Sequence, residues 1–268
     1  MIGIAGDWHG NTGWAGIALD AFAELDIKHI LQLGDFGIWP NTNDDKYLFR
    51  VNQNLVKNGQ TLWVTLGNHE DYNRIDKMAD HPQHEGWIWD PKFPSIIIAK
   101  RGTRWEWEGV SFVSLGGGNS IDVAGRTLDY TWWKQEQITL EDVFNTISGG
   151  YADVMLTHDS PTGVKMFGSH RETSWLWPPT AYAYANAGRD MMKQAVDGVK
   201  PGLLLHGHYH IFADNNTVLH DGVSTYELHS IGMGSDGDAT NLGVLTLSTK
   251  QFDLLPFTWK SEMAHHER

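Results

Sequence analysis

The stretch that decides the fold reads IGIAGDWH, from Ile2 to His9. Small and apolar residues fill its first part, and an acidic side chain, Asp7, and an imidazole, His9, follow them. A short apolar run that ends at a glycine is typical of a buried β-strand. Asp7 and His9 are two positions apart, so in extended chain both side chains would point to the same side. The stretch therefore predicts a buried strand that delivers two metal-binding side chains at its end.

Four further apolar runs end in the same way, at a residue type that can bind a metal. They are HILQLGD (29–35), TLWVTLGN (61–68), DVMLTH (153–158) and GLLLHGH (202–208), the last of which is followed by Tyr209 and His210. Parallel α/β sheets place their ligand sites beyond the carboxyl ends of the strands. We therefore expect the polar ends of all five runs to meet at one edge.

Helical patterns lie between these runs. Apolar residues recur at helical spacing over residues 15–25, 45–56 and 191–199, and a capping-box-like start at Thr139 predicts another helix. The middle and the last part of the chain favour strands, with Asn215-Asn216 as a hairpin tip. The mixture predicts an α/β fold, a β-sandwich of two sheets flanked by helices, with residues 1–268 as a single domain.

Composition narrows the class of protein. The 268 residues include no cysteine, which excludes disulfides, thiolate nucleophiles and cysteine-ligated metals. The formal net charge of −13 disfavours a protein that holds nucleic acid through its phosphates. Neither a signal peptide nor a membrane span is evident, so we expect a cytoplasmic protein with no stable nucleic-acid or membrane partner. The sequence leaves the oligomeric state open.

The polar run ends form an ordered set of motifs that is far more specific than any one of them. The set is Gly6-Asp7-Trp8-His9, Gly34-Asp35, Gly67-Asn68-His69-Glu70, Thr157-His158-Asp159-Ser160-Pro161 and Gly207-His208-Tyr209-His210. It resembles the calcineurin-like metallophosphoesterase family over residues 4–210. That resemblance implies a helix-flanked β-sandwich with a dinuclear metal site at its strand ends.

The resemblance also implies a division of labour among these residues. The first metal would be held by Asp7, His9, Asp35 and His210. The second would be held by Asp35, Asn68, His158 and His208. Asp35 would bridge the two ions, and His69 would be the catalytic residue that contacts the scissile phosphate.

The ligand chemistry agrees with two divalent transition-metal ions. Imidazole, carboxylate and amide groups without thiolate suit Mn²⁺, our first choice, and also Fe, Zn, Co or Ni. Mg²⁺ is a poorer match because it favours oxygen ligands and keeps its waters. Two such ions lower the pKa of water and neutralise phosphate oxygens. The sequence therefore predicts a metal-dependent hydrolase of phosphate esters.

Departures from the family pattern bear on the substrate. The Gly-Asp-x-x-Asp-Arg-Gly motif of large protein Ser/Thr phosphatases is absent, since Phe36-Gly37-Ile38 follow Asp35. The chain looks more like small bacterial and phage members, many of which cleave phosphodiesters. We expect a phosphodiesterase for small substrates such as cyclic nucleotides. The alternatives are a phosphomonoesterase or protein phosphatase, a nuclease with the same centre and, last, a non-catalytic protein-binding scaffold.

Substrate contacts are expected outside the metal motifs. Residues 165–189 are rich in aromatic side chains and show little periodicity, which favours a lid or cap, although a packed surface excursion is equally consistent. His170 and Arg171 in this segment could contact the substrate phosphate, although a solvated arginine is the commoner case. His206 lies within an apolar run and is expected to be a buried, hydrogen-bonded core residue.

Overall fold

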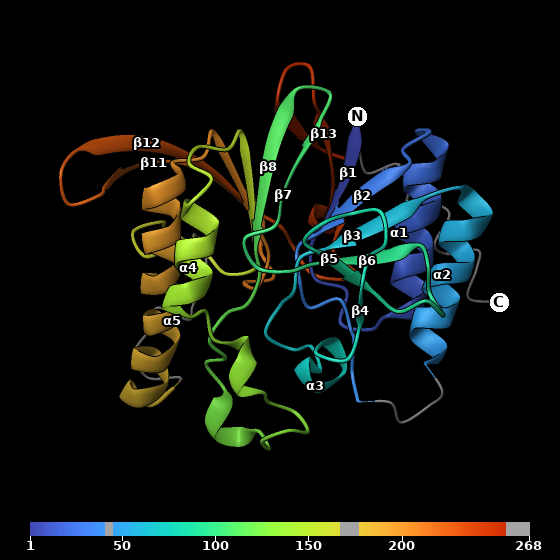
Figure 1. Ribbon diagram of the computed structural model, residues 1–268, viewed down its shortest axis with the longest axis horizontal. Coiled ribbons are helices and arrows are strands. Elements are labelled where there is room, and N and C mark those ends of the chain that lie inside the picture. The colour runs from blue at the N-terminus through green and yellow to red at the C-terminus, as the bar shows by residue number, and fades with distance from the viewer. Residues whose placement is uncertain (41–44, 167–176, 256–268) are drawn as a thin grey trace.

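The computed structural model describes residues 1–40, 45–166 and 177–255. Two β-sheets pack face to face, and helices cover the outer face of each sheet (Figure 1). The predicted α/β sandwich of two sheets flanked by helices is therefore confirmed. No helix in the described part of the chain combines the length and the apolar character that a membrane span requires.

In the described residues the first sheet has eight strands in the order β14-β13-β1-β2-β3-β6-β5-β4. Its centre is parallel, and consists of β1 (Ile2–Ala5), β2 (His29–Gln32), β3 (Thr61–Val64) and β6 (Ile96–Ala99). The flanking strands pair antiparallel, and are β4 (Ala79–Asp80), β5 (Trp87–Trp89), β13 (Leu242–Thr246) and β14 (Gln251–Leu254). Three of the five motif-bearing runs thus lie side by side in this sheet.

The second sheet, over the same described ranges, has six strands in the order β11-β12-β10-β9-β8-β7. Its parallel strands are β8 (Val110–Leu115), β9 (Val154–Thr157), β10 (Leu203–His206) and β12 (Thr225–Gly232). Its edge strands are β7 (Arg104–Trp107) and β11 (Ala213–His220). Asn215 and Asn216 lie within β11, so the predicted hairpin tip is wrong. This strand alternates buried and exposed residues, and it therefore accepts polar side chains along its length.

Four helices of the described residues cover the sheets (Figure 1). α1 (Thr12–Glu24) and α2 (Lys46–Asn58) pack on the first sheet, and α4 (Leu140–Ile147) and α5 (Pro179–Val199) pack on the second. Thr139 and Asp142 form the expected capping box at the start of α4. The short elements near the site are α3 (Tyr72–Ile75) and the 3₁₀ helices η1 (Val123–Gly125), η2 (Lys134–Glu136) and η4 (Ala239–Asn241).

α5 begins at Pro179, whereas the apolar spacing predicted a start at Met191. The added turns contain alternating alanine residues, which have the highest helix propensity but leave no amphipathic pattern. Proline also suits the first turn of a helix. Residues 179–189 are therefore helical, and the expectation of an irregular segment is wrong for that part.

Three layers of apolar side chains hold the sandwich together. Alternate residues of β2 show the division, since Ile30 packs toward α1 and Leu31 packs between the sheets. A third cluster lies between the second sheet and α5. The strands that precede the five motifs are buried on both faces, so they are apolar at nearly every position and carry polar residues only at their ends. β8 and β12 also carry polar residues at interior positions.

Candidate metal centre

The ends of β1, β2 and β10 bring together the first group of ligand types. One ligand atom each from Asp7, His9, Asp35 and His210 lies within 4.8 Å of the others. His210 Nε2 is 3.1 Å from Asp7 Oδ2, and His9 Nε2 is 3.7 Å from Asp35 Oδ2. Both carboxylates are buried, while the two imidazoles are partly exposed. The group therefore has an open side from which a substrate could approach.

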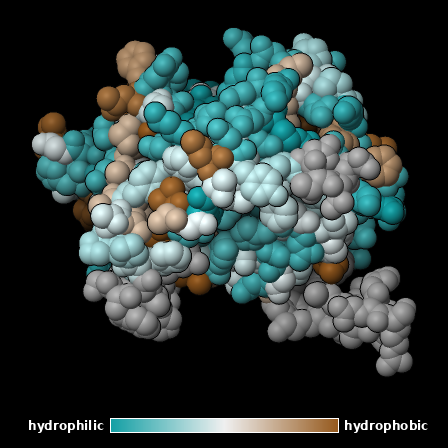
Figure 2. All heavy atoms as spheres, turned by 90° about the horizontal axis from the view of Figure 1, so that it is seen from below, coloured by the Kyte–Doolittle hydropathy of each residue, from teal (hydrophilic) through white to brown (hydrophobic). Residues whose placement is uncertain are grey.

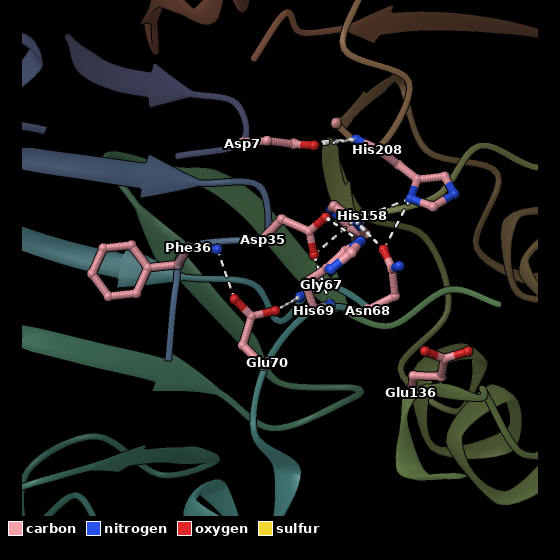
Figure 3. A network of polar contacts seen from close by, with 12 residues as sticks. Asp7, Asp35, Phe36, Gly67, Asn68, His69, Glu70, Glu136, His158 and His208 are labelled. Carbon is pink, nitrogen blue, oxygen red and sulfur yellow. Dashed lines mark hydrogen bonds and ion pairs between the residues drawn. The ribbon is translucent and has the colours of Figure 1, made fainter. Parts of the chain in front are cut away.

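The second group lies against the first and shares Asp35 with it. Ligand atoms of Asp35, His158 and His208 lie within 4.8 Å of one another. The amide of Asn68 joins them, because its Oδ1 is 2.9 Å from His158 Nε2 and 3.0 Å from His208 Nδ1 (Figure 3). The structure thus brings together all seven residues that the sequence predicted as ligands.

The backbone achieves this geometry differently from the expected extended pairs. β1 ends at Ala5 and β10 ends at His206, so each pair lies in a loop beyond its strand. His9, His208 and His210 have positive φ angles of 46°, 70° and 58°. His208 consequently joins the second group while His210 joins the first. The structure brings the predicted residues together, but the pairs do not lie in extended strand, so the argument from strand alternation was wrong.

Asp35 has the environment of a carboxylate that binds a cation. It is 1% exposed and has a positive φ of 50°. Its Oδ1 accepts a hydrogen bond from the backbone N–H of His69 at 2.9 Å, whereas its Oδ2 has no hydrogen-bond partner among the described residues. A buried, unpartnered carboxylate oxygen is costly unless a cation compensates it. The donor set and this oxygen therefore fit two metal ions that share Asp35.

The charges of the site also favour a cation. Burial acts to lower the pKa of His158, but the charge and hydrogen bond of Asp35 overcome it and raise that pKa to about 10. Burial opposes His9 in the same way, and contacts with Asp35 and Asp236 raise its pKa to about 9. Each of these imidazoles therefore carries a second proton, and with it a positive charge, when no metal competes for it. A divalent ion would replace those protons with a larger positive charge.

His69 lies at the rim of the two groups, as expected for a residue that meets substrate. Its Nε2 is 3.9 Å from Asp35 Oδ2 and contacts the guanidinium of Arg126. Burial is the main cause that lowers the pKa of His69, and Arg126 adds to it against the opposing charge of Asp35. Arg126 had no spacing signal in the sequence, because it lies in the long connection between β8 and α4.

Glu70 is a further site residue whose role the sequence did not show, although it belongs to a quoted motif. Its buried carboxylate accepts hydrogen bonds from the backbone N–H groups of Phe36 at 2.6 Å, Gly37 at 3.2 Å and Gly67 at 2.8 Å. Figure 3 shows it between the loops that follow β2 and β3. Glu70 therefore fixes Asp35 relative to Asn68.

Asn68 is oriented by residues from the connection between β8 and α4. Its Nδ2 donates to Ser120 Oγ at 2.8 Å, and Ser120 Oγ donates to Glu136 Oε2 at 2.5 Å. Tyr184 of α5 donates to the other oxygen of Glu136 at 3.0 Å. This chain of hydrogen bonds turns Oδ1 of Asn68 toward the histidines. Tyr184, which belongs to the aromatic-rich segment 165–189, thereby supports the site. The sequence does not reveal this contact, because Tyr184 and Glu136 are far apart along the chain.

The remaining predicted residues divide into two cases. His170 and Arg171 lie outside the described residues, as do all of residues 167–176 of the predicted lid. His206 is fully buried, as expected, and its Nδ1 is 3.2 Å from the carbonyl oxygen of Gly207. Burial lowers the pKa of His206 to about 4, so its ring is neutral at pH 7. It supports the β10 loop from the core and does not line the centre.

Comparisons with known proteins agree with this geometry. The profile described as calcineurin-like phosphoesterase matches residues 1–212, and the chain therefore belongs to that family. It is a metal-dependent phosphoesterase, and its family uses a dinuclear divalent metal centre for phosphate-ester substrates. The matched residues include both ligand groups and His69. No curated protein matches the chain at a significant level.

Solved structures match the chain at low sequence identity, and the two with TM-scores above 0.5 share its fold. The protein TT1561 of Thermus thermophilus has a TM-score of 0.51 and 12% identity, covering 94% of this chain and 97% of its own. Another crystal structure reaches a TM-score of 0.59 at 10% identity, covering 96% of this chain and 98% of the other. A dimetal phosphatase from Danio rerio is 12% identical over 87% of each chain, with a TM-score of 0.48.

Proposed function

We propose that the protein is a dinuclear phosphodiesterase that acts on small phosphate esters such as cyclic nucleotides. The observation that carries the proposal is the pair of ligand groups that share the buried Asp35, with His69 at their open side. In this proposal Asp7, His9 and His210 complete one metal site. Asn68, His158 and His208 complete the other.

The chain's own residues divide the work of hydrolysis. When bound, the two ions would supply a nucleophilic hydroxide from water and neutralise the charge of the phosphate. Asp35 would contribute to both metal sites, and Glu70 keeps the loop of Asp35 in place. His69 would contact the phosphate and stabilise charge, or give a proton to the leaving oxygen as the P–O bond breaks. Its position at the rim suits that contact.

Several features favour a small substrate. The net charge of −13 opposes long polyanions, which supports a mononucleotide-sized ester over a nucleic acid. The absent Gly-Asp-x-x-Asp-Arg-Gly motif argues against a dedicated protein phosphatase.

We propose Mn²⁺ as the metal, with Fe, Zn, Co or Ni as alternatives for the same ligands. We also retain the predictions of one domain over residues 1–268, a lid at 165–189 and a cytoplasmic location.

Hydrolysis of bis(p-nitrophenyl) phosphate by the Mn²⁺-loaded protein tests the proposal. We expect Asp35→Asn and His69→Ala to lower kcat/KM by roughly 100-fold or more, a typical loss for a metal bridge or an acid–base group. His220→Ala, an exposed histidine on the far hairpin, is the control and should keep wild-type activity. Wild-type rates in both site variants would overturn the proposal.

A substrate panel separates the ester classes. It contains p-nitrophenyl phosphate, 2′,3′- and 3′,5′-cyclic nucleotides and a single-stranded oligonucleotide. The proposal predicts the highest kcat/KM for a diester of mononucleotide size. Fast cleavage of the oligonucleotide with poor turnover of mononucleotides would instead identify a nuclease.

A further inference from the structure

A cavity of about 270 Å³ opens directly beside His69. Its lining comes from the loop after β2, the loop after β3 and the connection between β8 and α4, and consists of Trp39, Pro40, His69, Tyr130, Thr131 and Trp133. Figure 2 views the molecule from the end at which α3 lies, and shows near-neutral and hydrophobic residues among hydrophilic ones on that face. Since His69 belongs to both, the cavity continues the metal centre.

Aromatic rings form most of this cavity's wall. Trp39 and Tyr130 are 45% and 57% exposed, whereas Trp133 is 2% exposed and closes the cavity from inside. Large aromatic side chains left open beside a reaction centre offer flat faces for stacking with a ring of the substrate. Pockets for drug-sized ligands measure about 300–1,000 Å³, so this cavity suits a single ring system and not a peptide.

Hydrogen bonds hold the two open walls in place. Arg74 donates to the carbonyl oxygen of Trp39 at 2.8 Å, and an ion pair with Asp45 at 2.7 Å fixes the guanidinium of Arg74. On the other wall, the N–H of Thr127 donates to Thr131 Oγ1 at 2.8 Å, and the N–H of Tyr130 donates to the carbonyl oxygen of Thr127 at 3.2 Å. The backbone that carries Trp39 and Tyr130 is therefore held in place, which limits the entropy that binding would cost.

The same connection brings a cation to the boundary between the cavity and the metal centre. The side chain of Arg126 is 8% exposed, and Asp122 holds it through Nε at 2.8 Å and Nη2 at 3.0 Å. Its Nη2 also contacts His69 Nε2. Asp122 offsets part of the charge of Arg126, and Nη1 donates to the carbonyl oxygen of Thr131 at 3.4 Å, so Nη2 is the group that faces His69 at this boundary. A phosphate oxygen that replaced this direct contact would accept hydrogen bonds from both side chains.

We propose that the cavity is the leaving-group subsite for a flat aromatic group, a nucleobase or an aryl ring, and that Arg126 contacts a non-bridging oxygen of the phosphate. The proposal rests on the proposed function and names the substrate class of that site. Trp39 and Tyr130 stack on the ring, and His69 faces the ester oxygen between ring and metals. Esters that lack an aromatic leaving group would bind without this contribution.

Two kinds of probe test the two halves of the subsite separately. Adenosine and inorganic phosphate serve as inhibitors of bis(p-nitrophenyl) phosphate hydrolysis by the Mn²⁺-loaded protein. Trp39→Ala and Tyr130→Ala should raise the Ki for adenosine roughly tenfold, in line with base–aromatic stacking, and leave the Ki for phosphate unchanged. Arg126→Gln should raise the Ki for phosphate by a similar factor and leave that for adenosine unchanged.

Trp107→Ala is a matched control, because this partly buried tryptophan of β7 belongs to a separate aromatic cluster. It should change neither inhibition constant. Equal Ki values in wild type and in all three cavity variants would overturn the subsite. Thermal unfolding of each variant identifies any protein that fails to fold, and Tyr130→Phe, which keeps the ring, should then restore adenosine inhibition.

Isothermal titration calorimetry keeps this test independent of catalysis. Adenosine and phosphate are titrated into the Mn²⁺-loaded wild type and into the Trp39→Ala and Arg126→Gln variants. Suppose that the protein hydrolyses no ester, but Trp39→Ala weakens only adenosine binding and Arg126→Gln weakens only phosphate binding. The proposed activity then fails and the subsite stands. If it hydrolyses esters but binds adenosine equally well with and without Trp39, the subsite fails alone.

Discussion

The imidazole of His9 is held by a residue far away in sequence. Its Nδ1 is 2.8 Å from Asp236 Oδ1, and Asn11 donates to the other oxygen of Asp236 at 2.8 Å. Carboxylates that orient a metal-binding histidine in this way fix its ring and raise its basicity. Asp236 therefore positions His9 so that Nε2 points at the first metal site.

Asp236→Asn is expected to weaken metal binding at the first site by roughly 10–100-fold, the usual effect of losing such a carboxylate. Calorimetric titration of metal-free protein with Mn²⁺ measures it. The matched control is Asp214→Asn, because Asp214 makes an equally short contact of 2.8 Å with His229 on the exposed hairpin. If the two variants bound Mn²⁺ equally tightly, Asp236 would have no positioning role.

The seven candidate ligands could be proposed from the sequence, but the residues that orient them could not. Each ligand follows a buried strand, and that local pattern is visible in any one motif. Asp236 contacts His9 across 227 positions, and Asn241 contacts Asp7 across 234. Their partners are set by the packing of η4 and β13 against β1, which no spacing records. Supporting residues of this kind require the fold.

At the scale of elements, the loops after the strands approach one another too closely for a side chain. A Cβ on Gly207 would lie 2.1 Å from Asp7 Oδ1, and one on Gly67 would lie 2.2 Å from Asp35 Oδ1. The loop after β10 therefore passes directly over the carboxylate at the end of β1. Glycine at these places is a requirement of packing, because neither position has a positive φ.

Gly207→Ala should displace Asp7 and lower both Mn²⁺ affinity and kcat/KM by more than roughly tenfold, with a stability loss of about 1–3 kcal/mol from overpacking. Gly125→Ala is the control, since a Cβ there meets no atom within 4 Å. Metal titration and urea unfolding on both variants measure the two effects. Full metal affinity in Gly207→Ala would show that the loop can move aside.

The strands and helices followed from the sequence to different extents. Strands with apolar residues at every position were recognisable because both of their faces are buried. The first half of α5 was not, since its helical structure depends on alanine propensity and on Tyr184 packing near Glu136. The hairpin of β11 and β12 was misplaced because a half-exposed strand tolerates asparagine. Elements whose sequence lacked periodicity were therefore the ones predicted poorly.

At the scale of the whole molecule, the proposed metal ligands come from both sheets. Asp7, Asp35 and Asn68 follow strands of the first sheet, whereas His158 and His208 follow strands of the second. Ions shared by these residues would link the two halves of the sandwich. Metal binding should therefore stabilise the entire fold, because the unfolded chain cannot assemble the site.

Thermal unfolding with and without Mn²⁺ measures that linkage. At a free metal concentration of 1,000 times Kd, one site adds about 4 kcal/mol, which corresponds to a rise in Tm of roughly 10 °C for a chain of this size. The Asp35→Asn protein should show little of this rise because it loses the shared ligand. An equal rise in that variant would mean that Mn²⁺ stabilises the protein elsewhere.

The same linkage predicts how metal binding depends on pH. In the metal-free protein, contacts with Asp35 and Asp236 raise the pKa of His9 to about 9, and Asp35 raises the pKa of His158 to about 10. Both imidazoles are therefore positively charged at pH 7. Each must lose one proton before it can bind a metal, because a histidine ligand is neutral. For each imidazole that Mn²⁺ must deprotonate, the apparent affinity falls about tenfold for every pH unit below the pKa of that imidazole. Between pH 6 and 8 we expect affinity to rise by roughly 10- to 100-fold per unit. Titrations in buffers of different ionisation enthalpy should detect the released protons, and an affinity that is flat over this range would show that neither histidine binds the metal.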